Sequence, residues 1–153
     1  MESMKKYFYN SLIALFGGLF GVSILFIVYH LIFTVGRFES PFPATPLGHF
    51  LFILIVVSFV EEGTKFLLIK KDIGQFPYGF LLGFGFGTGE TVLKYSFWEY
   101  GVTFLNRSGP ILLHIITAGI ICYFVKKNRP VLGLVIAIGI HAGFDLLAGW
   151  TAQ

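Results

Sequence analysis

The chain is poor in charged residues. Only 12% of its 153 residues are Asp, Glu, Lys or Arg, whereas 56% are hydrophobic. Ordinary soluble domains carry roughly 25% charged residues, so the composition excludes that class and predicts that the lipid bilayer surrounds most of the chain. We therefore expect a multi-pass protein of the cell membrane, specifically of a prokaryotic plasma membrane.

The sequence also lacks a second cysteine, a nucleotide-binding loop and a basic surface patch. The single cysteine, Cys122, cannot form an internal disulfide. The run GFGFGTG at residues 83–89 lacks the spacing of a dinucleotide-binding or phosphate-binding loop and follows no predicted strand, so we do not expect nucleotide binding. The net charge of +3 comes from basic residues between the predicted helices, without a basic patch that alternates with exposed aromatics. We therefore expect no nucleic-acid partner.

Apolar stretches of helical length divide the chain. An α-helix needs roughly 20 apolar residues to cross about 30 Å of hydrocarbon. The sequence therefore predicts an all-α fold, a polytopic bundle of about five transmembrane helices, with a single transmembrane domain over residues 1–153. Residues 36–46, which contain three prolines, are predicted to form an extended surface loop. The predicted spans are residues 8–35, 47–69, 76–97, 110–125 and 130–150.

The basic residues predict the orientation, because Lys and Arg are retained on the cytoplasmic side of a membrane. Seven of them fall on one side of the predicted bundle and two on the other. This asymmetry predicts a cytoplasmic N-terminus and, with five spans, a C-terminus outside. The larger set is Lys5, Lys6, Lys70, Lys71, Lys126, Lys127 and Arg129, and the smaller set is Arg37 and Arg107.

Glycines mark the predicted span 76–97 as the central helix. Gly79, Gly83 and Gly87 repeat every four residues along one face, and Gly85 and Gly89 lie beside them. Small residues let membrane helices approach closely. We therefore expect this helix to pack against more than one neighbour.

Ionisable residues interrupt the last four predicted spans. A charge at mid-bilayer costs about 2.5 to 3.5 kcal/mol, so these side chains should face one another or water. At about 1.5 Å per residue, their carboxylates and imidazoles fall at similar depths and form one layer. Residues four apart share a helix face, which pairs Glu61 with Lys65, Glu90 with Lys94 and His141 with Asp145. The complete set is Glu61, Glu62, Lys65, Glu90, Lys94, His114, His141 and Asp145.

The residue types in this layer suit hydrolysis. A carboxylate withdrawn from water can act as a general base, so Glu61 or Glu62 would take a proton from a water molecule. His114 and His141 could hold the attacking water or donate hydrogen bonds to a developing oxyanion. These four are the predicted catalytic residues.

The remaining members of the layer are predicted supporting residues, namely Glu90, Asp145 and Lys65. Asp145 lies one helical turn beyond His141 and could orient that imidazole or contact the substrate backbone. Lys65 lies about one turn from the predicted membrane edge, so it could instead extend its ammonium group to the surface. The sequence leaves open whether a cofactor is bound. The ligand set for a divalent metal such as zinc would be Glu62, Glu90, His114 and His141.

Four short motifs lie on the predicted helices in a recognisable order. They are EEGTK at residues 61–65, GFGFGTGETVLKY at 83–95, RSGPILLHIIT at 107–117 and IHAGFDLL at 140–147. Together they resemble the PrsW-like branch of the CAAX-protease and bacteriocin-processing superfamily. The resemblance implies an intramembrane protease, of glutamic type or assisted by a metal, that cleaves a membrane-anchored peptide or protein. It also implies that the paired glutamate activates water and that the histidines bind the water or the oxyanion.

Two other function classes stay open. The superfamily is also similar to the anterior-pharynx-defective scaffold of gamma-secretase, which suggests a non-catalytic scaffold or binding subunit. A scaffold of this size would act as a homo-oligomer or with a partner subunit. Buried carboxylates and imidazoles also form proton relays, so a proton-coupled carrier or an immunity protein is a further alternative. The sequence shows no inverted repeat of the kind that many carriers contain.

Overall fold

The computed structural model describes residues 2–29, 45–69, 76–98 and 104–151. These ranges contain helices and short turns but no β-strand, which confirms the predicted all-α class for this part of the chain. Most of the predicted loop 36–46 lies outside the described residues, as does the end of the first predicted span. Lys70, Lys71 and Arg37, used to predict the orientation, lie outside them as well.

Five helical rods correspond to the five predicted spans, with two differences at their ends. The first rod begins near the N-terminus instead of at residue 8, and the fourth begins six residues before Pro110. Pro110 was predicted to start its helix, but α5 continues through it. Prolines are tolerated inside membrane helices because neighbouring groups can satisfy the freed backbone carbonyl. The elements are α1 (Glu2–Tyr29), α2 (Pro46–Leu51) continued by η2 (Phe52–Ser58) and α3 (Phe59–Leu68), α4 (Phe76–Trp98), α5 (Phe104–Lys126) and α6 (Pro130–Thr151).

The second rod contains a π-helix, which the sequence did not predict. η2 joins α2 to α3 and ends at Ser58, three residues before Glu61. π-helical hydrogen bonds run from residue i to i+5, and such segments occur often at functional sites. The helix α3, which carries Glu61 and Glu62, therefore begins directly after a π-helical segment.

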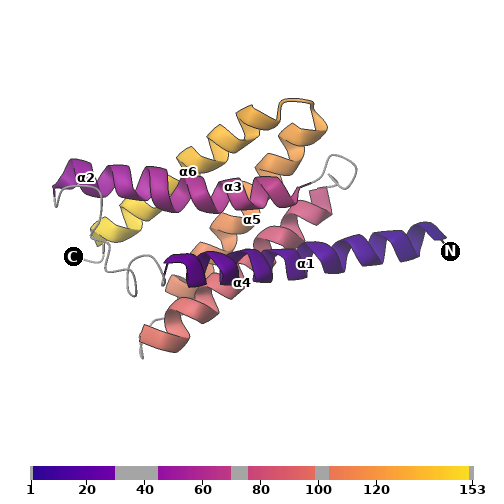
Figure 1. Ribbon diagram of the computed structural model, residues 1–153, viewed down its shortest axis with the longest axis horizontal. Helices are drawn as coiled ribbons and strands as arrows, with labels where there is room; N and C mark the ends of the chain where they lie inside the picture. Colours follow the sequence, from indigo (N-terminus) through magenta and orange to yellow (C-terminus); the bar gives the residue numbers. More distant parts are fainter. Residues whose placement is uncertain (1, 30–44, 70–75, 99–103, 152–153) are drawn as a thin grey trace.

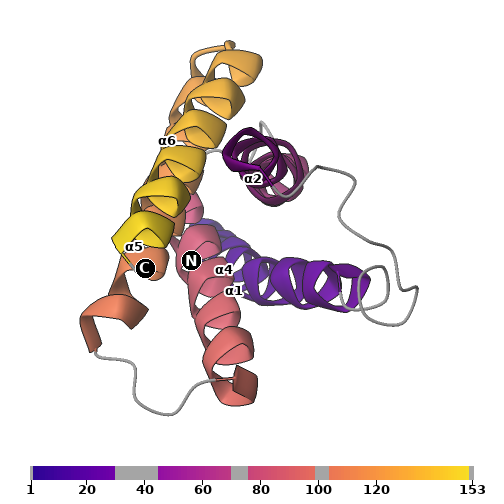
Figure 2. The ribbon, with the colours of Figure 1, turned by 90° about the vertical axis from the view of Figure 1, so that its left-hand side faces the viewer.

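The rods form two groups that cross at an angle. α1 and the α2–α3 rod run along the long axis of the molecule in Figure 1, whereas α4, α5 and α6 lie obliquely to them. Figure 2 views α2 nearly end-on and α1 obliquely, with α4 and α6 running up the picture. α4 packs against both α1 and α5, and α6 packs against α5 and η2. Successive rods alternate in direction, so the two chain ends lie at opposite ends of the molecule (Figure 1).

Glycines produce the close packing of α4, as the sequence predicted. A Cβ atom added to Gly83 or Gly87 would collide with the α5 backbone, at 2.6 Å and 2.7 Å from the Cα atoms of Ile115 and Ile111. On the opposite side, Gly85 faces the backbone carbonyl of Leu15 in α1. Helices can approach this closely only where side chains are absent. α4 is therefore fixed between two neighbours by its glycines.

Within the described ranges, three of the five rods are long and apolar enough to cross a membrane. These segments are Met4–Val28, Ser108–Lys126 and Pro130–Ala148. α1 also exposes large apolar side chains along much of its length, with Phe16, Phe20 and Ile24 each more than half exposed. A soluble protein seldom leaves so much apolar surface in water. The other two rods, α2–α3 and α4, carry the buried acids Glu61, Glu62 and Glu90.

Candidate functional site

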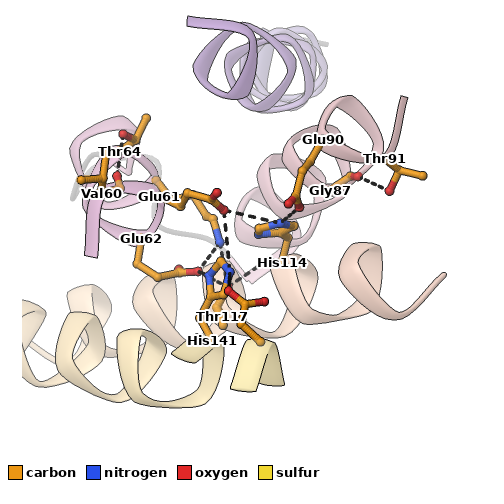
Figure 3. A network of polar contacts seen from close by, with 12 residues as sticks. Val60, Glu61, Glu62, Thr64, Gly87, Glu90, Thr91, His114, Thr117 and His141 are labelled. Carbon is orange, nitrogen blue, oxygen red and sulfur yellow. Dashed lines mark hydrogen bonds and ion pairs between the residues drawn. The ribbon is translucent and has the colours of Figure 1, made fainter. Parts of the chain in front are cut away.

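The polar side chains that interrupt the helices meet at one place in the bundle. α3 contributes Glu61, Glu62 and Lys65, α4 contributes Glu90, α5 contributes His114, and α6 contributes His141. All six are buried, and three of them, Glu62, Lys65 and His114, have no exposed surface. Figure 3 shows most of these side chains converging from their separate helices. The helical count of the sequence had placed the carboxylates and imidazoles at similar depth.

Glu61 lies between the two imidazoles. Its Oε2 atom is 3.9 Å from Nε2 of His114 and 3.7 Å from Nε2 of His141. The two rings contact each other edge to face, with centroids 5.2 Å apart (Figure 3). A carboxylate and two imidazole nitrogens thus surround one small volume of the protein interior.

Glu62 differs from its neighbour, because three donors hold one of its oxygens. Oε1 accepts hydrogen bonds from Nζ of Lys65 at 2.5 Å, Nδ1 of His141 at 2.6 Å and Oγ1 of Thr117 at 3.1 Å. These donors come from α3, α6 and α5. Because its lone pairs are engaged, Oε1 has little capacity to take a proton from water. Oε2 of the same carboxylate is buried and has no hydrogen-bond partner among the described residues. Through Oε1, Glu62 holds three neighbouring side chains in place.

His114 makes its close contact with Glu90. Nε2 of His114 lies 2.5 Å from Oε2 of Glu90, and the glycine face of α4 brings the two helices together there. Nδ1 of His114 is buried and has no hydrogen-bond partner within the described ranges. An unbonded lone pair is tolerated more often than an unbonded N–H, so we assign the proton of a neutral His114 to Nε2.

The two imidazoles are held by different carboxylates. When Glu62 is ionised, Nδ1–H of His141 donates to it, and Nε2 of the same ring faces carboxylate oxygens of Asp145 at 3.4 Å and Glu61 at 3.7 Å. The Nε2–H of His114 is directed at Glu90. Glu61 thus lies beside two rings that are each held by another carboxylate.

Asp145 lies at the edge of this cluster. Its Oδ2 atom is 3.4 Å from Nε2 of His141, and about a quarter of its side chain is exposed. The predicted spacing of four residues on α6 therefore brings these two side chains together. The partner predicted for Glu90, Lys94, has a side chain outside the described part of the chain.

Lys65 points into the bundle, which excludes the alternative that it extends to the membrane surface. Its side chain is fully buried, and Nζ lies 5.0 Å from the centre of the Phe86 ring. Its ion pair is with Glu62, three residues earlier, and the sequence had paired it with Glu61, four residues earlier. Both spacings place side chains on one helix face, so the count could not choose between the two glutamates.

Thr117 is a member of the site that the sequence did not reveal. It is fully buried on α5, one turn beyond His114, and it contacts both Glu62 and Lys65. A threonine in an apolar helix usually bonds a carbonyl of its own helix, so its presence in a span is not a signal. In the sequence, the feature that points to Thr117 is its position three residues after His114.

The residues also fit a divalent metal. Ligand atoms of Glu61, His114 and His141 all lie within 4.8 Å of one another, and all three residues are buried. Two imidazoles and a carboxylate are a common ligand set for zinc, and a second carboxylate on the far nitrogen of a ligating histidine is typical of such sites. Glu62 has that relation to His141. The carboxylate ligands predicted from the sequence were Glu62 and Glu90, whereas the structure groups Glu61 with the imidazoles.

Comparisons with known proteins assign no family, because no family model, curated protein or solved structure matches the chain. The resemblance of its motifs to the PrsW-like branch therefore stays a prediction.

Proposed function

We propose that this chain is an intramembrane peptidase in which Glu61 activates a water molecule and His114 and His141 assist. The observation that carries the proposal is the position of Glu61 Oε2, within 4 Å of the Nε2 atoms of both imidazoles in a buried site. The order of the four motifs supports the same activity. The substrate would be a membrane-anchored peptide or protein.

The proposed reaction gives the carboxylate of Glu61 and the two rings separate roles. Glu61 takes a proton from water while the water oxygen bonds to the carbonyl carbon of the peptide. Nε2–H of His114 turns from Glu90 to donate to the oxygen that becomes negative, and His141 holds the attacking water. The C–N bond then breaks, and the proton held by Glu61 passes to the departing amine nitrogen. The net change is the addition of one water across one peptide bond.

A divalent metal such as zinc, when bound by Glu61, His114 and His141, would polarise the carbonyl and the water. The residues around it would keep the roles of orienting the substrate and fixing the rings. Metal content after purification, and activity after dialysis against a chelator, decide between the two forms of water activation.

The proposal also includes five membrane passes with the N-terminus in the cytoplasm. Lys126, Lys127 and Arg129 are exposed at the turn between α5 and α6. Basic residues of short loops are retained in the cytoplasm. The acids of α3 and α4 would then be shielded from lipid by the neighbouring helices.

The test is hydrolysis by the purified chain in liposomes that also contain a library of single-span peptides, with products identified by mass spectrometry. We expect Glu61→Gln to lower the cleavage rate by roughly 10²- to 10⁴-fold, because it removes the base. His114→Gln should lower it by roughly 10²- to 10³-fold, as expected for the loss of an oxyanion donor.

The matched control is Glu2→Gln, the same chemical change at the first residue of α1. It should cleave at the wild-type rate. Cleavage that survives Glu61→Gln would show that the assigned base is wrong. A wild-type chain that cleaves no peptide but co-purifies with a second protein would favour the scaffold.

One feature favours a second candidate, a proton-conducting protein. Glu90, His114, Glu61, His141 and Asp145 form a chain of titratable groups in which each successive pair lies within 3.9 Å. Such a chain can pass protons through a bundle. Proton flux into liposomes, measured with a pH-sensitive dye, separates the two functions: flux lost in Glu61→Gln without any cleavage by the wild type would support this candidate.

A further inference from the structure

The buried face of α3 is polar, and the polar stripe begins one residue before the helix. Between residues 58 and 68, the buried side chains are Ser58, Glu61, Glu62 and Lys65, each at most 6% exposed. On the other side of the same helix, the apolar side chain of Leu67 is 80% exposed. Residues three and four apart lie on one helix face, so Ser58 lies on the same face as both glutamates.

The hydroxyl of Ser58 has no hydrogen-bond partner within the described ranges. Ser58 precedes α3 with helical backbone angles, and its side chain does not cap the helix. For Ser58, the carbonyl four residues earlier lies inside η2, where backbone hydrogen bonds span five residues, and the hydroxyl does not bond to it. Other helical hydroxyls do donate to the carbonyl four residues earlier, as in Ser11, Ser23, Thr64 and Thr91.

A second buried atom without a partner lies on the next turn. Oε1 of Glu62 accepts three hydrogen bonds, but Oε2 of the same carboxylate accepts none from the described residues. Ser58 is four residues before Glu62 and three before Glu61, so it is a neighbour of both glutamates on the preceding turn. Because Cα–Cβ bonds tilt toward the N-terminus of a helix, side chains of the later turn start out toward Ser58.

We propose that Ser58 Oγ and Glu62 Oε2 bind a water molecule beside Glu61, and that this site holds the water consumed in hydrolysis. Water fits these atoms because it can donate one hydrogen to the carboxylate oxygen and also bond the hydroxyl. Buried polar groups are nearly always hydrogen-bonded, and one water would satisfy both. The inference deepens the proposed function: the binding rests on the two atoms alone, whereas the role in hydrolysis rests on Glu61 as the base.

The water site predicts a loss of stability when the Ser58 hydroxyl is removed, whereas a hydroxyl without any partner predicts a gain. A buried hydroxyl that bonds nothing is unfavourable, but one that holds a water contributes a hydrogen bond. Alanine also favours a helix more than serine does, so Ser58→Ala needs a second Ser→Ala change for comparison. Ser23→Ala is that matched control, because Ser23 Oγ donates to the Leu19 carbonyl of its own helix at 2.8 Å.

The experiment uses the full chain, crystallised from a lipid mesophase for the structure and unfolded in mixed micelles for the stability. In the wild type, a water oxygen should lie roughly 2.5 to 3.2 Å from both Ser58 Oγ and Glu62 Oε2. Ser58→Ala should lose this water, and its equilibrium constant of unfolding should be roughly 5-fold higher than that of Ser23→Ala. If Ser58→Ala does not fold, Ser58→Cys gives the same comparison, because a thiol is a weak hydrogen-bonding group.

Cleavage in liposomes tests the role in hydrolysis separately. For the cleaved peptide, Ser58→Ala should lower kcat roughly 10- to 100-fold at unchanged KM, because the reacting water is no longer held in place. Ser23→Ala should keep the wild-type kcat. A wild-type kcat in Ser58→Ala would overturn the role of this water in hydrolysis.

Two results would overturn the water site itself: a wild-type crystal structure without a water oxygen at Ser58, and a Ser58→Ala variant more stable than Ser23→Ala. A wild type that holds the water but cleaves no peptide would support the site and overturn the proposed peptidase function. A wild type that cleaves peptide by means of Glu61 without this water would support the peptidase and overturn the inference.

Discussion

The α1–α4–α5 side of the molecule and the α3–α5–α6 side are held together in opposite ways. Between α4 and its neighbours, glycines let backbones touch, as where Gly83 faces the carbonyl of His114 and Gly85 faces that of Leu15. On the other side, long polar side chains span the space between helices, with Glu62 joining three of them. Backbone contact leaves no room for reactive groups, so the chemistry lies where side chains separate the helices.

His114 belongs to both sides. Its backbone faces the glycine stripe of α4, and its ring faces Glu61 and Glu90. The tight packing of α4 on α5 therefore sets the position of an imidazole in the site. Substitutions on the two sides should therefore differ in the size of their effect on stability and cleavage.

The largest effect on stability should come from Glu62→Leu. The change leaves the ammonium group of Lys65 buried without its ion-pair partner, and removing one partner of a buried pair typically costs about 3 to 5 kcal/mol. The free energy of unfolding in mixed micelles measures it. The double variant Glu62→Leu with Lys65→Met removes both charges and should recover much of the loss. A double variant as unstable as the single one would show that the ion pair does not hold this side together.

Gly83→Ala should have an intermediate effect, about 1 to 3 kcal/mol, because its Cβ would meet the α5 backbone and force the helices apart. It should also slow cleavage per folded molecule, since His114 moves with that backbone. Gly85→Ala is the control, because it disturbs the α1 side at a similar cost in stability but should leave cleavage per folded molecule unchanged. Equal effects of both variants on cleavage would remove the distinction between the two sides.

The smallest effect should come from Gly139→Ala on α6. A Cβ atom at this position meets nothing within 4 Å, so the close-packing rule does not apply to it. The free energy of unfolding should rise by at most about 1 kcal/mol, reflecting the better helix propensity of alanine. A clear loss of stability would indicate a contact of α6 that the isolated chain does not show.

Much of the architecture could be predicted because it depends on local patterns. Apolar runs bounded by proline, glycine and charge predicted all five rods, and the four-residue repeat of Gly79, Gly83 and Gly87 predicted that α4 is central. The helix ends were predicted less well, because Pro110 was taken as a start signal and is tolerated inside α5. The number of membrane passes stays a prediction, since three rods qualify by length and apolarity.

The site could be predicted as a set of residues but not as an arrangement. Helical counting grouped the acids and histidines by depth, since depth follows from rise per residue. Helical counting could not decide which of Glu61 and Glu62 faces the two imidazoles. Adjacent residues point about 100° apart, and the rotation of α3 about its own axis is set by its neighbours. Thr117 was missed for a different reason, since a hydroxyl in a helix can be satisfied locally.

The π-helix η2 has a consequence for how this protein can be aligned and engineered. Residues 46–51 and 59–68 belong to one rod, yet the π-helical segment between them puts the two parts on helical wheels of different phase. A helix face of α2 therefore does not continue in the same direction into α3, because η2 lies between them. One residue deleted from Phe52–Ser58 is expected to be absorbed there by a return to α-helical bonding, which would keep the register of Glu61 in α3.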